Sequence, residues 1–590
     1  MNFFKTFLAS CLGSLLALVV LVVLLIGFFS AAISSFSDAD KQVVVDENSV
    51  LHLKLNVPIT EMEIENPFEG LPIPGAEEAS IGLLPLKSAL THAKTDAAIK
   101  GIYLDVSFFQ GGYAVAKEIR ESIIDFRKSG KWVIAYSEMY SEPSYYIASA
   151  ADKVFLNPEG EIEFNGLAIE ISFFKKMFDK LEIKPEIFRV GDFKSAVEPF
   201  FLDKMSDANR LQLKALIDEI NNSVIREVAE SRKINEEEVR KISTQMLVTN
   251  TQEAKQYKLI DSLVYYDQVQ LDLRSRLGLK QNAKIPFVKY SKYKKSFTPY
   301  LSTSKNEIAV IVADGDIIPG KAQEGSIGSE TFAEELRKAR TNEKVKAIVL
   351  RINSPGGSAL ASDVMWREVT LASKAKPVIA SMSNYAASGG YYIAMGCDTI
   401  VAQPNTITGS IGVFSVLFDL SSFLDKKIGI TFDEVKTGDV GELVTFTRPL
   451  TTMEKSIWQK KTDLIYEGFT SKAAAGRHMP VDQLRKVASG RVWVGTQAKE
   501  KGLVDVIGGF DDAVRIAAQK AKIGEDYKLK FYPKQKNFLA QWLQGMEENT
   551  RTNTIKAELG EEGFQTLQQI KKVKHFQGAQ ARMPFEFQWK

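Results

Sequence analysis

Short apolar runs alternate with longer mixed runs along most of this chain. In its second half, residues 308–312, 347–350 and 378–380 are almost entirely Val, Ile, Leu and Ala. Runs of this length, bounded by polar or helix-breaking residues, are typical of buried strands. Between them, residues 330–340 and 358–374 have a helix-forming composition. Strands that alternate with helices predict an α/β fold with a parallel sheet.

The most apolar segment lies at the N-terminus. No charged residue occurs in residues 6–36, and residues 15–29 are nearly continuous Leu, Val, Ile and Phe. This length fits a membrane span better than the shorter core of a secretory signal. Lys5 precedes the run and Asp38 follows it, so the positive-inside bias predicts a cytoplasmic N-terminus and an exported body. We predict a cytoplasmic stub and membrane anchor over residues 1–37, with a cleaved export signal as the alternative.

The body of the chain contains an internal repeat. The apolar run 102–106 resembles 348–352, and residues 145–148 and 391–394 both read Tyr-Tyr-Ile-Ala. Further matches follow in the same order at an offset of about 246 residues. Chance similarity between apolar strands could explain any single match, but an ordered series of matches indicates duplication.

The repeat divides the chain into domains. We predict an N-terminal repeat over residues 45–297, a C-terminal repeat over 306–538 and a polar helical tail over 539–590. Residues 207–233 and 453–475 are long helical patterns at corresponding places of the two repeats. The predicted fold is therefore two tandem α/β domains after an N-terminal transmembrane helix.

Composition excludes several classes of function. Seventy-five Lys and Arg residues against 73 Asp and Glu residues leave a net charge of +2, which gives no field that favours nucleic acid. Two cysteines and four histidines are too few for a disulfide framework or a multi-histidine metal centre. We expect no metal and no cofactor, and a serine hydrolase here would need a base other than histidine.

The two repeats differ at Ser388. The first repeat has Glu142 at the corresponding place. Small residues flank the serine, among them Gly389 and Gly390, and an apolar helix follows. The hydroxyl is then accessible, and the amides at the start of the helix can hold an oxyanion. We predict that Ser388 is a catalytic nucleophile, with a simple helix cap as the alternative.

A second difference precedes Ser388 by about thirty residues. Gly356 and Gly357 follow a predicted strand, whereas the first repeat has Gln110 in this turn. The amides of two glycines can point into a cleft, as an oxyanion hole requires. We predict an oxyanion hole from Gly356, Gly357 and Gly389, with a plain β-turn as the alternative for the pair.

A nucleophilic serine needs a base. Lys194 has no basic counterpart in the second repeat, and Phe193, Val197 and Phe200 surround it in the sequence. Burial disfavours the ammonium form. To act as a base near neutral pH, Lys194 would need a pKa roughly 3 units below its ordinary value. Such a decrease requires about 4 kcal/mol of desolvation. An exposed surface lysine is the alternative.

These segments resemble the signal peptide peptidase A (protease IV) family in its long, duplicated, membrane-anchored form. The segments are Asn-Ser-Pro-Gly-Gly at 353–357, Ala-Ala-Ser-Gly-Gly at 386–390, Thr-Gly-Ser-Ile-Gly at 408–412 and Phe-Lys-Ser-Ala-Val-Glu-Pro at 193–199. The resemblance extends from the anchor to about residue 540.

The resemblance implies a Clp-protease/crotonase-like fold and a serine peptidase. Ser388 would be the nucleophile, Lys194 the base and Ser410 a hydroxyl beside the lysine. It further implies a homotetramer at the bacterial inner membrane, with the catalytic domains on the periplasmic side, that degrades cleaved signal peptides and other apolar peptides. Two alternatives remain from the residues alone: a crotonase-like acyl-CoA enzyme and a non-catalytic membrane scaffold.

Overall fold

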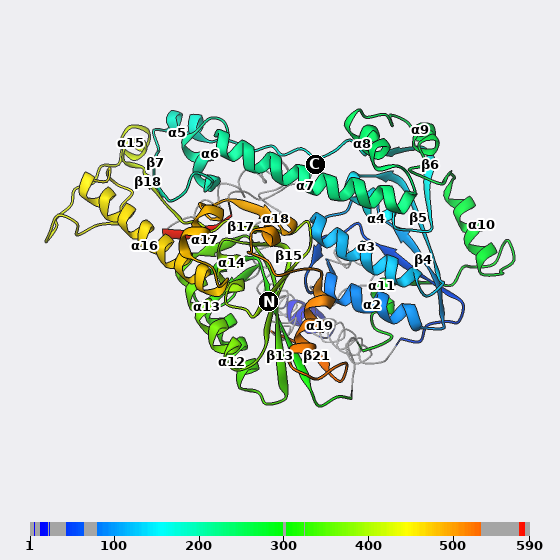
Figure 1. Cartoon of the computed structure of the whole chain (residues 1–590). Helices are drawn as coiled ribbons and strands as arrows, with labels where there is room; N and C mark the ends of the chain where they lie inside the picture. Colours follow the sequence, from blue (N-terminus) through cyan, green and yellow to red (C-terminus); the bar gives the residue numbers. More distant parts are fainter. Residues whose placement is uncertain are drawn as a thin grey trace.

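The computed structural model of the chain describes residues 5, 7, 12–21, 23, 43–63, 80–298, 303–323, 325–532 and 578–583. Most of the predicted anchor and most of the predicted tail lie outside these residues. Within them, no helix combines the length and the apolar character that crossing a bilayer requires. The described residues belong mainly to the two halves of the body and to one short segment near the C-terminus (Figure 1).

The first half contains a six-stranded sheet in the order β8-β6-β5-β4-β1-β9, in which every pairing is parallel. Its strands are β1 (Ser49–Lys54), β4 (Ile99–Asp105), β5 (Trp132–Tyr140), β6 (Lys153–Ile162), β8 (Ser262–Leu263) and β9 (Phe287–Lys289). Alternate residues of a strand face opposite sides. Leu51 and Ile102 pack on one side and Val50 and Tyr103 on the other.

Helices cover both faces of this sheet. The helices on one side are α2 (Leu83–Thr95), α3 (Tyr113–Arg127), α4 (Glu142–Ala148) and α7 (Asp207–Arg232), and the helix on the other is α10 (Tyr266–Arg276). The burial of both faces explains why the strands are apolar runs rather than alternating patterns.

The second half repeats this arrangement. Its strands follow the same relative order, β20-β16-β15-β13-β10-β21, again with parallel neighbours. They are β10 (Glu307–Asp314), β13 (Val345–Ser354), β15 (Val378–Ala387), β16 (Thr399–Ala402), β20 (Val506–Ile507) and β21 (Lys528–Tyr532). The sheet extends past β15 through β17 (Ile407–Gly409) to the antiparallel β19 (Val492–Val494).

Helices cover the second sheet as they cover the first. The helices on one face are α12 (Ser329–Thr341), α13 (Ala359–Ser373) and α14 (Gly389–Ala394), and the helix on the other is α19 (Phe510–Lys520). The predicted strands and helices of this half are therefore confirmed, and the two long helices are α7 and α16 (Thr452–Gly476). The α/β class is confirmed, while the closer likeness to Clp-protease and crotonase folds stays a prediction.

Matching hydrogen bonds mark the duplication. Tyr145 and Tyr391 each donate the side-chain hydroxyl to a backbone carbonyl, at 2.7 and 3.0 Å. Asp261 and Asp505 each accept a backbone amide, from β6 and β16 respectively, at 2.8 and 2.7 Å. The repeat seen in the sequence therefore extends to individual side-chain contacts.

A smaller sheet joins four separate stretches of the chain in the order β12-β11-β14-β22-β18-β7. Its strands are β7 (Lys184–Arg189), β11 (Asp316–Ile318), β12 (Ser326–Gly328), β14 (Gly356–Ser358), β18 (Phe414–Asp419) and β22 (Gly578–Arg582). The sequence predicts a helical tail over residues 539–590, and this is wrong for residues 578–582. They form a strand because β14 and β18 lie on either side and provide its backbone partners.

An arm of the first half, residues 175–201, reaches across to the second half. It carries α5 (Lys175–Leu181), β7 and α6 (Glu198–Phe201), and Figure 1 shows it in cyan beside the yellow α16. Strand β7 pairs antiparallel with β18 over its whole length, from Lys184 opposite Asp419 to Arg189 opposite Phe414. The chain then returns along α7. The arm thus places a segment of one half inside the other.

A buried ion-pair network also joins the halves. Arg351 on β13 lies 2.7 Å from Glu61 and 2.7 Å from Glu118, and all three side chains are fully buried. Lys87 lies 3.1 Å from Glu118. Burial alone would raise the pKa of Glu118, but Arg351 and Lys87 outweigh it and lower the pKa to about 2. The Glu118 carboxylate is therefore ionised at neutral pH, and Arg351 and Lys87 stabilise this buried negative charge.

Replacing Arg351 tests this network. Arg351→Leu leaves two buried carboxylates short of a cation, and we expect it to lower the free energy of unfolding by about 3–5 kcal/mol. Arg337→Leu is the matched control, because Arg337 is exposed and pairs with Glu368 at 3.2 Å, where a loss of about 1 kcal/mol or less is expected. Urea unfolding measures both. Equal losses in the two variants would show that the network does not hold the halves together.

Candidate active site

Ser388 lies in the turn between β15 and α14. Its φ of 55° falls in the left-handed region, which a non-glycine residue adopts only at an energetic cost. The Ser388 amide donates to Gly409 O at 2.8 Å. The side chain is buried and makes no helix-capping hydrogen bond. The alternative interpretation of Ser388 as a simple helix cap is therefore wrong.

Lys194 lies in the loop that follows β7 of the arm, and its side chain contacts Ser388. Its Nζ lies 2.9 Å from Ser388 Oγ, 3.0 Å from Ser410 Oγ and 3.1 Å from Ser410 O. The lysine is fully buried, so the surface alternative is wrong, and burial lowers its pKa well below the ordinary value of 10.5. A neutral amine has two N–H donors and one lone pair. The two oxygens of Ser410 accept the N–H groups, which leaves the lone pair for the Ser388 hydroxyl.

Two glycines let neighbouring backbone segments pass close to the Lys194 side chain. Gly490 has a φ of 79°, and a Cβ there would lie 2.6 Å from Lys194 Cβ. A Cβ on Gly412 would lie 3.1 Å from Lys194 Cδ. Phe193 donates its amide to Ser489 O at 3.2 Å. Gly490 is not predictable from the sequence, because a single glycine outside any motif gives no signal of the contact it makes.

Polar side chains fix the arm behind Lys194. Ser195 Oγ donates to Asn209 Oδ1 at 2.9 Å, and Gln212 Nε2 donates to Ser195 Oγ at 2.8 Å. Asn209 Nδ2 donates to the buried Glu198 Oε2 at 3.0 Å. Gln212 Oε1 accepts the Val492 amide at 3.3 Å, which links α7 to the second half. A buried network whose donors and acceptors meet one another specifies one arrangement of the arm.

The three glycines predicted to form the oxyanion hole lie close together but belong to two different elements. Gly356 and Gly357 belong to β14, and Gly389 begins α14. A Cβ on Gly389 would lie 3.0 Å from Gly356 Cα. The Gly356 amide donates to Ser354 Oγ at 3.2 Å, and Gly357 pairs with Ile317 of β11 and Ala581 of β22. An oxyanion hole formed by Gly356, Gly357 and Gly389 stays a prediction.

The first half has no nucleophile at the corresponding place. Glu142 begins α4 and is buried, and its Oε2 accepts the amides of Asn165 and Gly166 at 2.9 and 2.8 Å. Its Oε1 is buried without a hydrogen-bond partner among the described residues. Burial raises the pKa of Glu142 to about 7. The first half therefore has a buried carboxyl group where the second half has the Ser388 hydroxyl.

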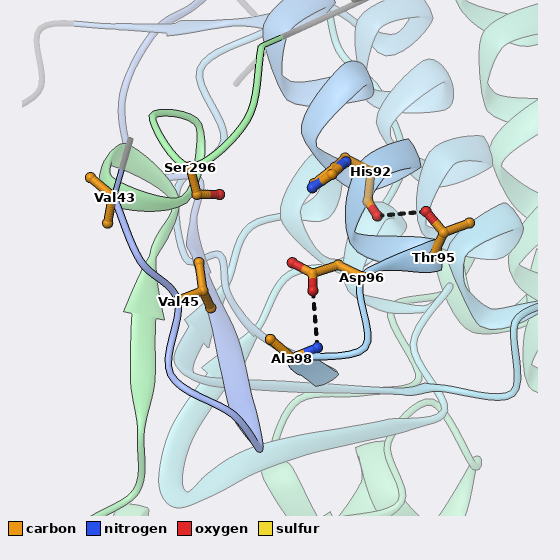
Figure 2. A pocket seen from close by; sticks show the side chains of 7 residues that line it. All are labelled: Val43, Val45, His92, Thr95, Asp96, Ala98 and Ser296. Atoms are coloured by element: carbon orange, nitrogen blue, oxygen red, sulfur yellow. Dashed lines mark hydrogen bonds between the residues drawn. The ribbon is translucent and has the colours of Figure 1, made fainter. Parts of the chain in front are cut away.

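A pocket lies on the first half, away from these residues (Figure 2). Its lining residues are Val43, Val45, His92, Thr95, Asp96, Ala98 and Ser296. His92 stacks on Phe297 with ring centroids 4.2 Å apart, and Asp96 accepts the Ala98 amide at 2.9 Å. These contacts give His92 a structural role. In the part of the chain that the structure describes, no group of three His, Cys, Asp or Glu side chains is placed to hold a metal ion.

The raised pKa of Glu142 predicts a pH-dependent stability. The folded protein favours the protonated carboxyl, so its stability falls as the pH rises from the unfolded value of 4.5 through about 7. Glu142→Gln keeps an acceptor oxygen and carries no charge. We expect it to stabilise the protein by about 1–3 kcal/mol at pH 8 and to change little at pH 4.5. Thermal unfolding measures this against the exposed control Glu159→Gln, and an identical pH response of the two variants would contradict it.

The model of Peptidase family S49 matches residues 125–280 and 370–524 of the chain. One matched stretch lies in each half, so the family match agrees with the duplicated sheets. The two stretches leave the N-terminal segment and the tail outside the match.

Three relatives match most of the body. Serine protease SPPA, chloroplastic, from Arabidopsis thaliana is 38% identical over 75% of this chain and 66% of its own length. Protease 4 from Haemophilus influenzae is 37% identical over 74% of this chain and 73% of its own. Protease 4 from Salmonella typhi is 36% identical over 80% and 76%, respectively. The chain therefore belongs to peptidase family S49, as an SppA-type serine protease with two copies of the family domain.

Proposed function

We propose that this chain is an endopeptidase in which Ser388 is the nucleophile and Lys194 the general base. The observation that carries the proposal is the 2.9 Å separation of Lys194 Nζ and Ser388 Oγ. Burial removes the water that stabilises an ammonium group, and no charged side chain of the described residues counteracts this. An amine that is uncharged near neutral pH can accept the serine proton.

The geometry supports a two-step reaction. As Ser388 Oγ attacks the carbonyl carbon of a peptide, its proton passes to Lys194 Nζ. The amides of the predicted oxyanion hole stabilise the negative charge that develops on the carbonyl oxygen. Lys194 then protonates the leaving amine, and water hydrolyses the acyl-enzyme with the same amine as base. Ser410 accepts the lysine N–H groups throughout and keeps the amine oriented.

We further propose that cleaved signal peptides and other apolar peptides are the substrates. The apolar run of residues 6–36 would anchor the enzyme in the bacterial inner membrane, with the body on the periplasmic side. Signal peptides are released at this membrane after preprotein processing. The resemblance noted in the sequence supports a homotetramer as the working form.

Two substitutions test the dyad. We expect Ser388→Ala and Lys194→Met each to lower kcat for peptide hydrolysis by about 10³-fold or more, because each removes one partner of the proton transfer. Lys204→Met, at an exposed position just after the arm, is the control and should keep full activity. A fluorophosphonate probe should label Ser388 in the intact enzyme, which would exclude a non-catalytic scaffold. Substantial hydrolysis by either dyad variant would remove the proposed mechanism.

The pH profile tests the protonation state of the lysine. Only the uncharged amine accepts a proton, so kcat/KM should rise with pH up to the pKa of Lys194 and then level off. Because burial lowers that pKa well below 10.5, the plateau should begin well below this pH. Lys194→Arg keeps its charge at every accessible pH and should be inactive throughout. A rising limb centred near 10.5 would contradict a buried base.

A further inference from the structure

Strand β15 is irregular just before the chain reaches Ser388. In its pairing with β13, Asn353 alone lies opposite residues 383–385, which we call the bulge. On its other edge, β15 pairs with β16 up to Met382 and with β17 from Tyr385. A bulge interrupts the regular ladder and re-aims the strand, and bulges are frequent beside active sites. The groups that hold this bulge therefore determine where the strand delivers Ser388.

Side chains of the second half hold the two outer residues of the bulge. Asn353 Oδ1 accepts the Tyr385 amide at 3.3 Å. Thr406 donates its hydroxyl to Ser383 O at 2.7 Å, and Arg351 donates to Ser383 Oγ at 3.0 Å. These bonds need particular side chains, whereas a regular ladder needs only the backbone.

The first half holds the middle residue of the bulge, Asn384. Asn384 Oδ1 accepts the Val115 amide at 3.1 Å. Val115 is the third residue of α3, whose N-cap residue is Gly112 and has no side chain to accept an amide. A side-chain oxygen that accepts the amide of the third helical residue is a helix N-cap bond. Asn384 therefore supplies, from the other half, the cap that α3 lacks in its own segment.

This cap depends on a close approach between the halves. A Cβ on Gly112 would lie 2.3 Å from Asn384 Oδ1. Gly112 has a φ of −80°, which every residue type can adopt, so the glycine is needed for space. At the offset of the repeat, 246 residues before Asn384, the first half has the exposed Glu138. The residue that makes the cap thus differs between the repeats, as the nucleophile does.

Helix α3 reaches the bulge by a second route. Glu118 of this helix pairs with Arg351 at 2.7 Å, and Arg351 contacts Ser383. Tyr385 and Ala387 pack against the apolar core of the first half. The end of β15 is therefore held against the first half by a hydrogen bond, an ion pair and apolar packing.

We propose that Asn384 is a positioning residue, through which the first half fixes the place of Ser388 relative to Lys194. Ser388 follows Asn384 by four residues, and its left-handed φ of 55° persists only where the surrounding structure holds it. A displacement of about 1 Å between reacting groups can cost about 10²-fold in rate. The inference rests on the proposed function and adds to it a residue that acts through Ser388.

Two matched asparagine substitutions test the inference. Asn250 caps α9 (Thr251–Gln256) and accepts the Glu253 amide at 3.0 Å, so Asn250→Ala removes the same kind of bond as Asn384→Ala. We expect Asn384→Ala to lower kcat for peptide hydrolysis about 10-fold or more with KM nearly unchanged, and to slow fluorophosphonate labelling of Ser388 equally. Asn250→Ala should change neither rate. An unchanged kcat in Asn384→Ala, or a loss that lies wholly in KM, would overturn the inference.

A conservative substitution separates positioning from a general defect. Asn384→Asp keeps an oxygen that accepts the Val115 amide, so we expect its kcat to lie within about threefold of the unmodified chain. Thermal unfolding verifies that each variant is folded at the assay temperature. An Asn384→Asp variant as slow as Asn384→Ala would overturn the inference. An unmodified chain in which Ser388 is never labelled would instead overturn the proposed function.

A substitution in the first half tests the same contact from its other side. Gly112→Ala adds a Cβ where Asn384 Oδ1 lies, so it should slow labelling of Ser388 as Asn384→Ala does. Gly468→Ala in α16 is the control, because a Cβ there meets nothing within 4 Å, and it should label at the normal rate. The double variant of Gly112→Ala and Asn384→Ala should be no slower than either single variant, since both remove one contact. Effects that multiply in the double variant would overturn the inference.

Discussion

The chemistry proposed for this protein depends on the burial of one amine, that of Lys194. A lysine side chain in water titrates near 10.4, and lowering its pKa by three units requires about 4 kcal/mol. Lys194 is buried, and among the residues that the structure describes its Nζ lies within hydrogen-bond distance of oxygens of Ser388 and Ser410 alone. Neither half encloses this side chain alone. The free energy of folding of the whole body therefore provides the desolvation that lowers the pKa of this amine.

The arm explains how a duplicated chain came to have one site instead of two. Each half has the strand and helix that could hold a nucleophile, yet only the second has Ser388 there, and the first has Glu142. Only the first half extends an arm with a buried lysine, held by β7 on β18 and by the polar network of Ser195 and Gln212. Each half supplies the group that the other lacks, so neither is redundant.

The sequence predicted the parts of the site that differ between the repeats. Ser388 could be singled out because the first repeat has a chemically different residue at its place, whereas Lys194 was selected mainly by the resemblance of its segment to a known family. The apolar runs predicted the strands because the sheets are buried on both faces. Gly490 could not be found, because its role is a tertiary contact with Lys194. The bond between the Gly356 amide and Ser354 depends on turn geometry that spacing does not reveal. Strand β22 has no strand-like pattern of its own, and its neighbours impose its conformation.

The order of these segments along the chain has a consequence for biosynthesis. The ribosome makes Lys194 long before it makes Ser388, and Gly490, which packs on the lysine, emerges about 300 residues after it. At about 5–20 residues per second, that interval is roughly 15–60 seconds. During this time the arm's amine remains hydrated and protonated, and the nascent polypeptide is inert toward its neighbours. The proposed dyad can thus form only when nearly the entire body has been synthesised.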